Sequence, residues 1–205
     1  PAGLAAAYDL VRMGYGVTVF EALPVAGGML AVGIPEYRLP KDFLNSEIEA
    51  IKQIGVEIKT STPIGKNITI DDLFSQGYKS IFIATGAPLN LKLGIPGEEV
   101  EGVIDPIEFL KNYNREKKAK IGKKVAVVGG GNPAIDASRT AKRLDAEVTI
   151  PDRRTRPEMP ANREEIEEAL EEGIKIEFLT LPIEVYSKNG KLTKIKCTRM
   201  ELSDF

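Results

Sequence analysis

The chain contains no histidine, only one cysteine and no long hydrophobic run, and each absence narrows its chemistry. Without histidine, imidazole acid–base catalysis and most zinc sites are excluded within these residues. Cys197 has no second cysteine in the chain, which excludes an internal disulfide, a CxxC redox pair and a cysteine cluster site. Because it falls on a predicted strand, we expect it to be a small buried hydrophobic residue. No apolar run approaches the roughly 18 residues of a membrane helix, and no signal peptide is visible. These features predict a cytoplasmic protein in a reducing compartment.

What remains is an ordinary globular composition. The 205 residues are 42% hydrophobic and 28% charged, enough for one large domain or two small ones. A net charge of −2 gives no reason to expect nucleic acid or a membrane surface as partner. The sequence opens on "PAGLAAA", without methionine and in the middle of a motif. We therefore expect it to be a piece of a longer polypeptide.

The order of predicted elements indicates an α/β protein with parallel sheets. Strands are expected at "VTVFE", "VEIKT", "KVAVV", "EVTI" and "IKIEFLT", and "SIFIATGA" (80–87) is predicted as a strand covered on both faces. A hairpin is expected around an Asn-Gly turn near the end. The stretch 24–40 is too rich in Gly and Pro to be regular, and the basic run "REKKAKIGKK" (115–124) is interpreted as a solvated linker rather than a docking patch. Helices are predicted over 3–13, 41–54, 70–76, 106–113 and 163–172.

A dinucleotide-binding fingerprint stands in the second half of the chain. The strand "KVAVV" leads to Gly129, Gly130 and Gly131, and Ala134 takes the place of the third glycine in a GxGxxA pattern. The glycines permit a tight turn and close approach to a pyrophosphate, and the small third residue lets helix and strand pack closely. Free N–H groups at the start of the helix would hold the phosphates.

The start of the chain matches the second part of the same fingerprint. When Gly3 is aligned with Ala134, Glu21 falls on Asp152, because each acid follows its small residue by 18 positions. Both acids end a short β-branched run, where a carboxylate accepts hydrogen bonds from an adenosine ribose. Two such sites predict two dinucleotides, a flavin and a nicotinamide.

The second site carries conflicting signals about its cofactor. Arg153, Arg154 and Arg156 favour the 2′-phosphate of NADPH, because guanidinium groups bind phosphate through forked, charge-assisted hydrogen bonds. Asp152 argues for NADH, since a carboxylate accepts from a free 2′-hydroxyl and repels a phosphate. We favour NADP over NAD. Pro133 removes an N–H near the pyrophosphate, and Pro151 is expected to interrupt its strand and kink it locally.

Several motifs together resemble the glutamate synthase small (beta) subunit family of FAD/NADPH-dependent oxidoreductases. They are "PAGLAAA", "GYGVTVFEA", "AGGMLAVGIPEYRLP", "IFIATGA", "GKKVAVVGGGN", "EMPA" and "CTRMEL", and they cover essentially the whole chain. The sequence is equally similar to the large subunit of bifurcating ferredoxin:NADP oxidoreductase and to the flavin half of dihydropyrimidine dehydrogenase. The resemblance implies two Rossmann-like, doubly wound dinucleotide-binding domains, three-layered and with a small β-meander. Residues 1–120 would be the first part of the FAD domain and 121–205 an NAD(P) domain inserted in it.

The resemblance also implies a function. NADPH would pass hydride to FAD, and electrons would move on to iron–sulfur clusters held by a missing domain or by a partner. That partner would be a large catalytic subunit, as in glutamate synthase, or ferredoxin. No side chain of this chain is expected to be catalytic, because the cofactors carry the chemistry. The alternatives are a ferredoxin:NADP oxidoreductase-type electron-transfer subunit and a non-catalytic dinucleotide-binding module.

Site residues follow from the matched motifs. For FAD, the glycine loop is matched by Pro1, Ala2 and Gly3, the ribose acid by Glu21, and the loop along the flavin by Gly27, Gly28, Met29 and Leu30. Arg38 matches a cation near the cofactor, Ile64 a backbone contact on the adenine side, and Thr85 and Gly86 the "ATG" turn. For the nicotinamide cofactor they are the pyrophosphate turn and the ribose end: Gly129, Gly130, Gly131, Asn132, Pro133, Ala134, Asp152, Arg153, Arg154 and Arg156.

Overall fold

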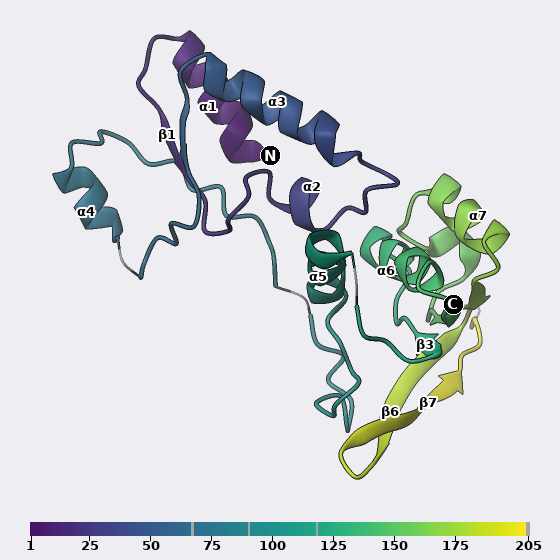
Figure 1. Cartoon of the computed structure of the whole chain (residues 1–205). Coiled ribbons are helices and arrows are strands. Elements are labelled where there is room, and N and C mark those ends of the chain that lie inside the picture. The colour runs from purple at the N-terminus through teal and green to yellow at the C-terminus, as the bar shows by residue number, and fades with distance from the viewer. Residues whose placement is uncertain (67, 90, 118, 204–205) are drawn as a thin grey trace. The chain divides into compact units, whose positions relative to one another are not determined.

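The chain forms two compact units in its computed structural model, which describes residues 1–66, 68–89, 91–117 and 119–203 (Figure 1). The first unit spans Pro1–Pro88 and the second Leu89–Phe205. Residues 89–120, which the sequence analysis grouped with the first domain, pack with the second unit. Each unit is described by itself below.

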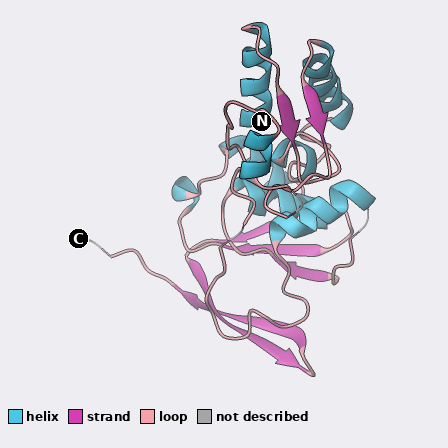
Figure 2. Ribbon diagram, turned by 90° about the vertical axis from the view of Figure 1, so that its left-hand side faces the viewer, coloured by secondary structure: helices cyan, strands magenta, loops and turns pink. Residues whose placement is uncertain are grey.

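The first unit pairs two parallel strands and packs helices beside them (Figures 1 and 2). Thr18 lies opposite Glu57 and Phe20 opposite Lys59 in the strand register. The long helices α1 and α3 pack against each other, and α1 also packs on β1. In chain order the elements are α1 (Ala2–Arg12), β1 (Thr18–Phe20), α2 (Met29–Val32), α3 (Lys41–Gln53), β2 (Glu57–Lys59) and α4 (Ile70–Ser75).

The local signals for these helices act as predicted. In α3, Leu44 and Ile48 are buried, as their spacing of four residues on one helix face requires. Gly55 ends the turn after α3 with a φ of 108°, a conformation that favours glycine. The reciprocal capping box between Thr69 and Asp72 at the start of α4 is confirmed.

Two predictions for the first unit are wrong. The stretch 80–87 is not a strand, and Phe82 and Ile83 are 64% and 68% exposed. A parallel strand needs neighbours on its edges and cover on its faces, but among the described residues β1 and β2 pair only with each other. The stretch 24–40 contains a short helix, α2, because the apolar run from Met29 to Val32 is free of Gly and Pro.

The second unit is built on a three-stranded parallel sheet in the order β3–β4–β5, followed by an antiparallel hairpin (Figure 2). Helix α6 packs on the central strand β4 and contacts both α5 and α7. Ile135, Val148 and Ile150 are fully buried at this interface. The elements are α5 (Pro106–Glu116), β3 (Lys124–Ala126), α6 (Asn132–Lys142), β4 (Glu147–Pro151), the 3-10 turn η1 (Arg156–Glu158), α7 (Arg163–Glu171), β5 (Lys175–Glu177), β6 (Thr180–Lys188) and β7 (Lys191–Arg199).

The hairpin is confirmed, and two further expectations are corrected. Asn189 and Gly190 both have positive φ, as a two-residue type I′ turn requires. Cys197, expected to be buried, lies exposed on β7. Pro151 does not interrupt β4 but is its last residue and stays in register with Glu177. The carbonyls of Thr149 and Pro151 accept hydrogen bonds from the β3 side, so the donor that proline lacks would have faced that strand.

Within the described residues, no helix combines the length and apolar character that crossing a membrane demands.

Candidate dinucleotide-binding site

Glu21 directly follows the last residue of β1 and takes part in three hydrogen bonds. Its N–H donates to the carbonyl of Lys59 (2.9 Å), and its own carbonyl accepts from the N–H of Thr62 (2.8 Å). Its side-chain Oε1 accepts from the N–H of Leu23, two residues on (2.8 Å). Ser61, whose N–H donates to the Leu23 carbonyl, has a φ of 53°. The acid is thus fixed at the carboxyl end of a parallel strand.

Asp152 repeats this arrangement in the second unit. Its N–H donates to the carbonyl of Glu177 (3.0 Å), and its carbonyl accepts from Thr180 (2.8 Å). Its Oδ1 accepts from the N–H of Arg154, again two residues on (2.7 Å). Leu179 donates to the Arg154 carbonyl and has a φ of 49°. The two acids therefore end equivalent strand–turn junctions, matched hydrogen bond for hydrogen bond.

The glycine loop of the second unit lies over Asp152. Gly129 has a φ of 111°, and its N–H donates to the carbonyl of Pro151 (3.2 Å). A β-carbon added at Gly130 would collide with Oδ2 of Asp152, so only glycine fits there. Asp152 is 1% exposed, and this Oδ2 has no hydrogen-bond partner among the described residues. The acid and the loop that the sequence assigned to one site are thus in direct contact.

The start of α6 offers donors to an anion. Within the part of the chain that the structure describes, the N–H groups of Gly130, Gly131 and Asn132 have no acceptor. Pro133, exposed in the first turn, has no N–H to add. Free amides at a helix N-terminus, reinforced by the helix dipole, bind phosphate groups. This geometry fits a pyrophosphate, with one donor fewer than a residue other than proline would give.

A short segment that the sequence analysis quoted within the motif "EMPA", without assigning it a role, is hydrogen-bonded to this loop. In residues 159–162, the N–H of Ala161 donates to the Gly130 carbonyl (3.1 Å). The N–H of Asn162 donates to the side-chain Oδ1 of Asn132 (2.9 Å). Because that Oδ1 is engaged, a predicted contact of Asn132 with the pyrophosphate rests on its backbone N–H. We call residues 159–162 the strap.

The three arginines of the predicted 2′-phosphate site do not behave alike. Arg153 is exposed and Arg154 half-buried, and neither forms an ion pair with a described residue. Arg156 Nη2 lies 2.5 Å from Oε1 of Glu167, in a pair exposed on both sides. Two of the three guanidinium groups are therefore available to an anion, and the third must first leave a weak surface pair.

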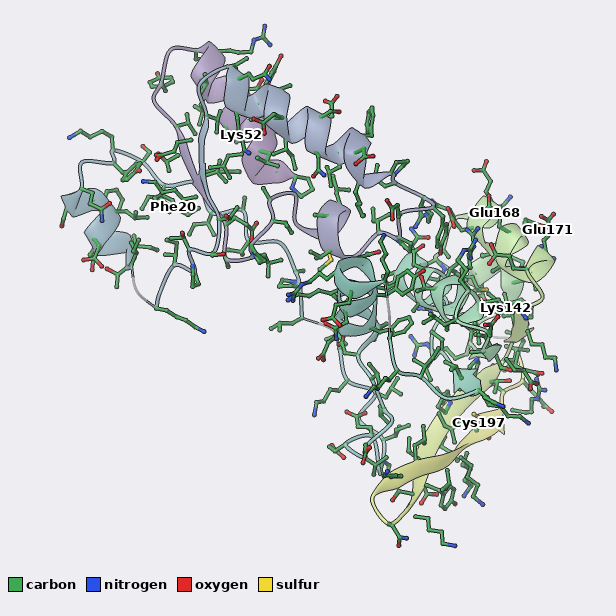
Figure 3. All side chains as sticks on the ribbon, in the orientation of Figure 1. Phe20, Lys52, Lys142, Glu168, Glu171 and Cys197 are labelled. Atoms are coloured by element: carbon green, nitrogen blue, oxygen red, sulfur yellow. The ribbon has the colours of Figure 1, made fainter. Side chains whose placement is uncertain are left out.

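Helix α6 is clamped to α7 by charges that the sequence analysis missed. Arg139 is 5% exposed and reaches Glu165 (2.6 Å), Glu168 (2.5 Å) and Glu172 (2.8 Å). Arg143 adds a second contact to Glu172 (2.8 Å). Figure 3 labels Glu168 on α7. The spacing of two arginines on one helix and three glutamates on the next was the signal that could have revealed this pairing.

One carboxylate of this clamp has a shifted pKa. Partial burial works to raise the pKa of Glu172, but hydrogen bonds from Arg143 and Arg139 outweigh it and hold the pKa below its ordinary 4.5. Glu172 is therefore charged at neutral pH.

In the first unit, segments far apart in sequence meet at the start of α1. A β-carbon at Gly28 would lie 3.3 Å from Pro1, and one at Gly3 would lie 3.4 Å from Ala84, next to the "ATG" turn. Of the remaining predicted FAD residues, Ala2, Thr85 and Gly86 are exposed, Gly27 is buried, and Met29, Leu30 and Arg38 are half-buried. Ile64 is 39% exposed and forms a one-residue bridge with Ile68.

Lys41 fixes the loop predicted to run along the flavin. Its Nζ donates to the carbonyls of Leu30 (2.8 Å) and Ile34 (2.6 Å), at and just beyond α2. A cation satisfies the carbonyls at a helix C-terminus. Sequence analysis did not single out Lys41, because its role depends on the fold of a short helix that was not predicted.

Residues 1–203 match the family model described as pyridine nucleotide-disulphide oxidoreductase. The chain is 48% identical over its full length to the NADP(+)-dependent formate dehydrogenase subunit beta of Moorella thermoacetica. It is 33% identical, again over its full length, to the glutamate synthase [NADPH] small chain of Escherichia coli. It spans only 29% of the first relative and 46% of the second.

Among solved structures, the chain resembles Mycobacterium tuberculosis FprA in complex with NADPH. The TM-score is 0.82 at 19% identity, over 98% of this chain and 62% of FprA. At that identity the likeness concerns the fold alone, an α/β fold with Rossmann-like units. With the family model matched over nearly every residue, the chain belongs to the pyridine nucleotide-disulphide oxidoreductase family.

Proposed function

We propose that this chain carries parts of the FAD site and of the NADP site of an NADPH-dependent flavin oxidoreductase. The first unit would hold FAD through its glycine loop and Glu21, and the second would hold NADP through its glycine loop and the arginines that follow Asp152. The observation that carries this proposal is the junction repeated at Glu21 and Asp152, with the same three hydrogen bonds around each acid. Two separate ribose acids on matched scaffolds suit two adenine dinucleotides.

For FAD, the support is the meeting of separate segments at the start of α1. Gly28 and Ala84 approach Pro1 and Gly3 closely enough that side chains at the glycines would crowd them. Such close backbone approach suits a loop that lies along a phosphate or a flat ring system. Glu21 would receive the ribose hydroxyls of the flavin cofactor, and Lys41 would keep the loop after Gly28 in place.

For NADP, the support is the set of unpaired donors at the second glycine loop. The amides of Gly131 and Asn132 would bind the pyrophosphate, and Arg153 and Arg154 would bind the 2′-phosphate. When bound, the two cofactors supply the chemistry, NADPH as hydride donor and FAD as acceptor. The chain's own residues bind and orient them, and none is required to act as acid, base or nucleophile.

Electrons would leave the flavin for an iron–sulfur carrier on another domain or subunit. The relatives' names support a role within larger redox proteins, since one is a formate dehydrogenase subunit and the other a glutamate synthase chain. Disulfide reduction would need a cysteine pair, and the 205 residues contain only Cys197. A subunit that feeds electrons to, or receives them from, an iron–sulfur partner fits best.

The test uses the full-length protein with its natural partner subunits. Purified protein should be yellow and should bleach when NADPH is added without oxygen. A colourless protein that binds neither FAD nor NADP+ would contradict the proposal and favour a non-catalytic module. Glutamine-dependent glutamate formation with a large subunit, or reduction of ferredoxin, would then identify the onward acceptor.

A further inference from the structure

We propose that the strap sets the direction of the Gly131 N–H and so positions this donor for the pyrophosphate. Ala161 and Asn162 are then positioning residues, which act on the glycine loop through their backbone N–H groups. The inference rests on the proposed NADP site and deepens it, because it concerns how that site is organised before a cofactor arrives.

The peptide group between Gly130 and Gly131 is held differently from the peptide group that follows it. The carbonyl of Gly131 accepts hydrogen bonds from the N–H groups of Ala134 (3.0 Å) and Ile135 (3.1 Å). Helix α6 itself therefore fixes the direction of the Asn132 N–H. No hydrogen bond from α6 reaches the Gly130 carbonyl in the described part of the chain. With a glycine on each side, this peptide group can rotate readily, so its orientation depends on a contact from outside the helix.

The strap supplies that contact. The N–H of Ala161 donates to the carbonyl of Gly130 at 3.1 Å. The described chain contains no cis peptide bond, and in a planar trans peptide the C=O and the N–H point in opposite directions. The Gly131 N–H, at the other end of the same peptide group, therefore points away from the strap. It has no acceptor among the described residues and is left as a donor for an anion.

The strap is itself anchored at both ends. Before it, a reciprocal capping box between Thr155 and Glu158 closes the turn η1. Within it, Ala161 is 6% exposed and belongs to the hydrophobic core. At its end, the N–H of Asn162 donates to Oδ1 of Asn132 at 2.9 Å, which adds a second hydrogen bond to the same loop. Because Ala161 and Asn162 are neighbours, loss of the second hydrogen bond should loosen the first.

The test compares two substitutions of Asn162 in the full-length, FAD-loaded protein. Asn162 has a φ of −58°, which proline also adopts, and its exposed side chain makes no capping hydrogen bond. Asn162→Pro therefore removes the N–H that donates to Asn132, whereas Asn162→Ala is the matched control that keeps it. In calorimetry, Asn162→Pro should bind NADP+ about fivefold more weakly, because losing one hydrogen bond lowers the fraction of loops that are ready to bind. Asn162→Ala should bind NADP+ as the wild-type protein does.

Adenosine 2′-monophosphate separates positioning of the loop from general damage to the site. It carries the ribose phosphate but no pyrophosphate, so the wild-type protein and both variants should bind it equally. The inference is overturned if Asn162→Pro and Asn162→Ala bind NADP+ equally, or if Asn162→Pro loses affinity for both ligands to the same extent.

If Asn162→Pro does not fold, Asn132→Ala takes its place, because it removes the acceptor of the same hydrogen bond. It is compared with the wild-type protein for the same two ligands, and it should weaken NADP+ alone. Unchanged NADP+ binding, or an equal loss of both ligands, would overturn the inference here too. Wild-type protein that binds neither NADP+ nor adenosine 2′-monophosphate would instead contradict the proposed function itself.

Discussion

The carboxylate of Asp152 occupies the space that a β-carbon at Gly130 would need. The packing of the glycine loop against the end of β4 therefore depends on both residues. Glycine at 130 is required by the protein's own packing before any cofactor binds.

The first prediction follows from this crowding. Gly130→Ala should destabilise the full-length protein by about 1–3 kcal/mol, because the added carbon overlaps Asp152 and presses on Met159. Thermal unfolding measures the loss. Gly131→Ala in the same loop is the matched control, since its β-carbon would meet Pro133 at an ordinary 3.6 Å. Equal destabilisation by both changes would contradict the packing argument.

The Arg139 clamp should matter more than the surface pair of Arg156. Arg139→Met removes the buried guanidinium that reaches Glu165 and Glu172, and we expect a loss of about 2 kcal/mol in unfolding free energy. Arg156→Met removes a pair with both side chains about half exposed or more, and should change stability by less than about 1 kcal/mol. Denaturant titration measures the unfolding free energy of both variants. A similar loss in each would contradict the larger contribution of the Arg139 clamp.

The same clamp predicts a pH dependence. Because the pKa of Glu172 is lower in the folded protein than its ordinary 4.5, its contribution to stability is present above pH 4.5 and lost as the pH falls through the folded value. Glu172→Gln should therefore flatten the decline of unfolding free energy between about pH 5 and pH 3. A decline of unchanged steepness in the variant would show that other carboxylates dominate.

Lys41 should control the order of the loop after Gly28. Lys41→Met removes the hydrogen bonds from Nζ to the carbonyls of Leu30 and Ile34, so amide hydrogen exchange in residues 27–34 should speed up. If this loop lies along the flavin, the variant should also release FAD more readily. Lys52→Met, which loses only an exposed pair with Glu49 on the same helix, is the control and should leave both readouts unchanged. Unaltered exchange in Lys41→Met would remove Lys41 from this role.

Asn132 should act on the strap through its side-chain oxygen. Asn132→Ala removes the acceptor of the Asn162 N–H, and hydrogen exchange at Asn162 should accelerate without any cofactor present. Asn132→Asp keeps an acceptor and should preserve protection at Asn162, although its charge should weaken dinucleotide binding. Acceleration in both variants would show that the amide group serves another purpose.

Sequence patterns predicted the elements whose signals are local. The capping box at Thr69, the Asn189-Gly190 turn and the apolar stripe of α3 each depend on neighbours a few residues away, and each is confirmed. The equivalence of Glu21 and Asp152 could also be predicted, because a repeat spacing is a property of the sequence itself.

The features that sequence patterns did not predict depend on residues that are distant in the sequence. An apolar run such as 80–87 is a strand only if other strands flank it, and the strap bonds to Asn132 across 30 residues. The exposure of Cys197 follows from a hairpin whose β7 strand is open to solvent along most of its length. The division of the chain after Pro88 follows from packing between residues that are distant in sequence. How each predicted site residue meets its cofactor stays a prediction.

Ser61 and Leu179, which both have a positive φ, stand at equivalent positions in the two units. The hydrogen bonds around the two acids correspond as far as Thr62 and Thr180, and beyond these residues one unit continues into an irregular stretch before α4 while the other continues along β6. The segment beyond these residues therefore differs in architecture between the two units, while the hydrogen bonds around the acid are the same. A pair of units built in this way can join different neighbouring structures, and the local scaffold around Glu21 and around Asp152 need not change.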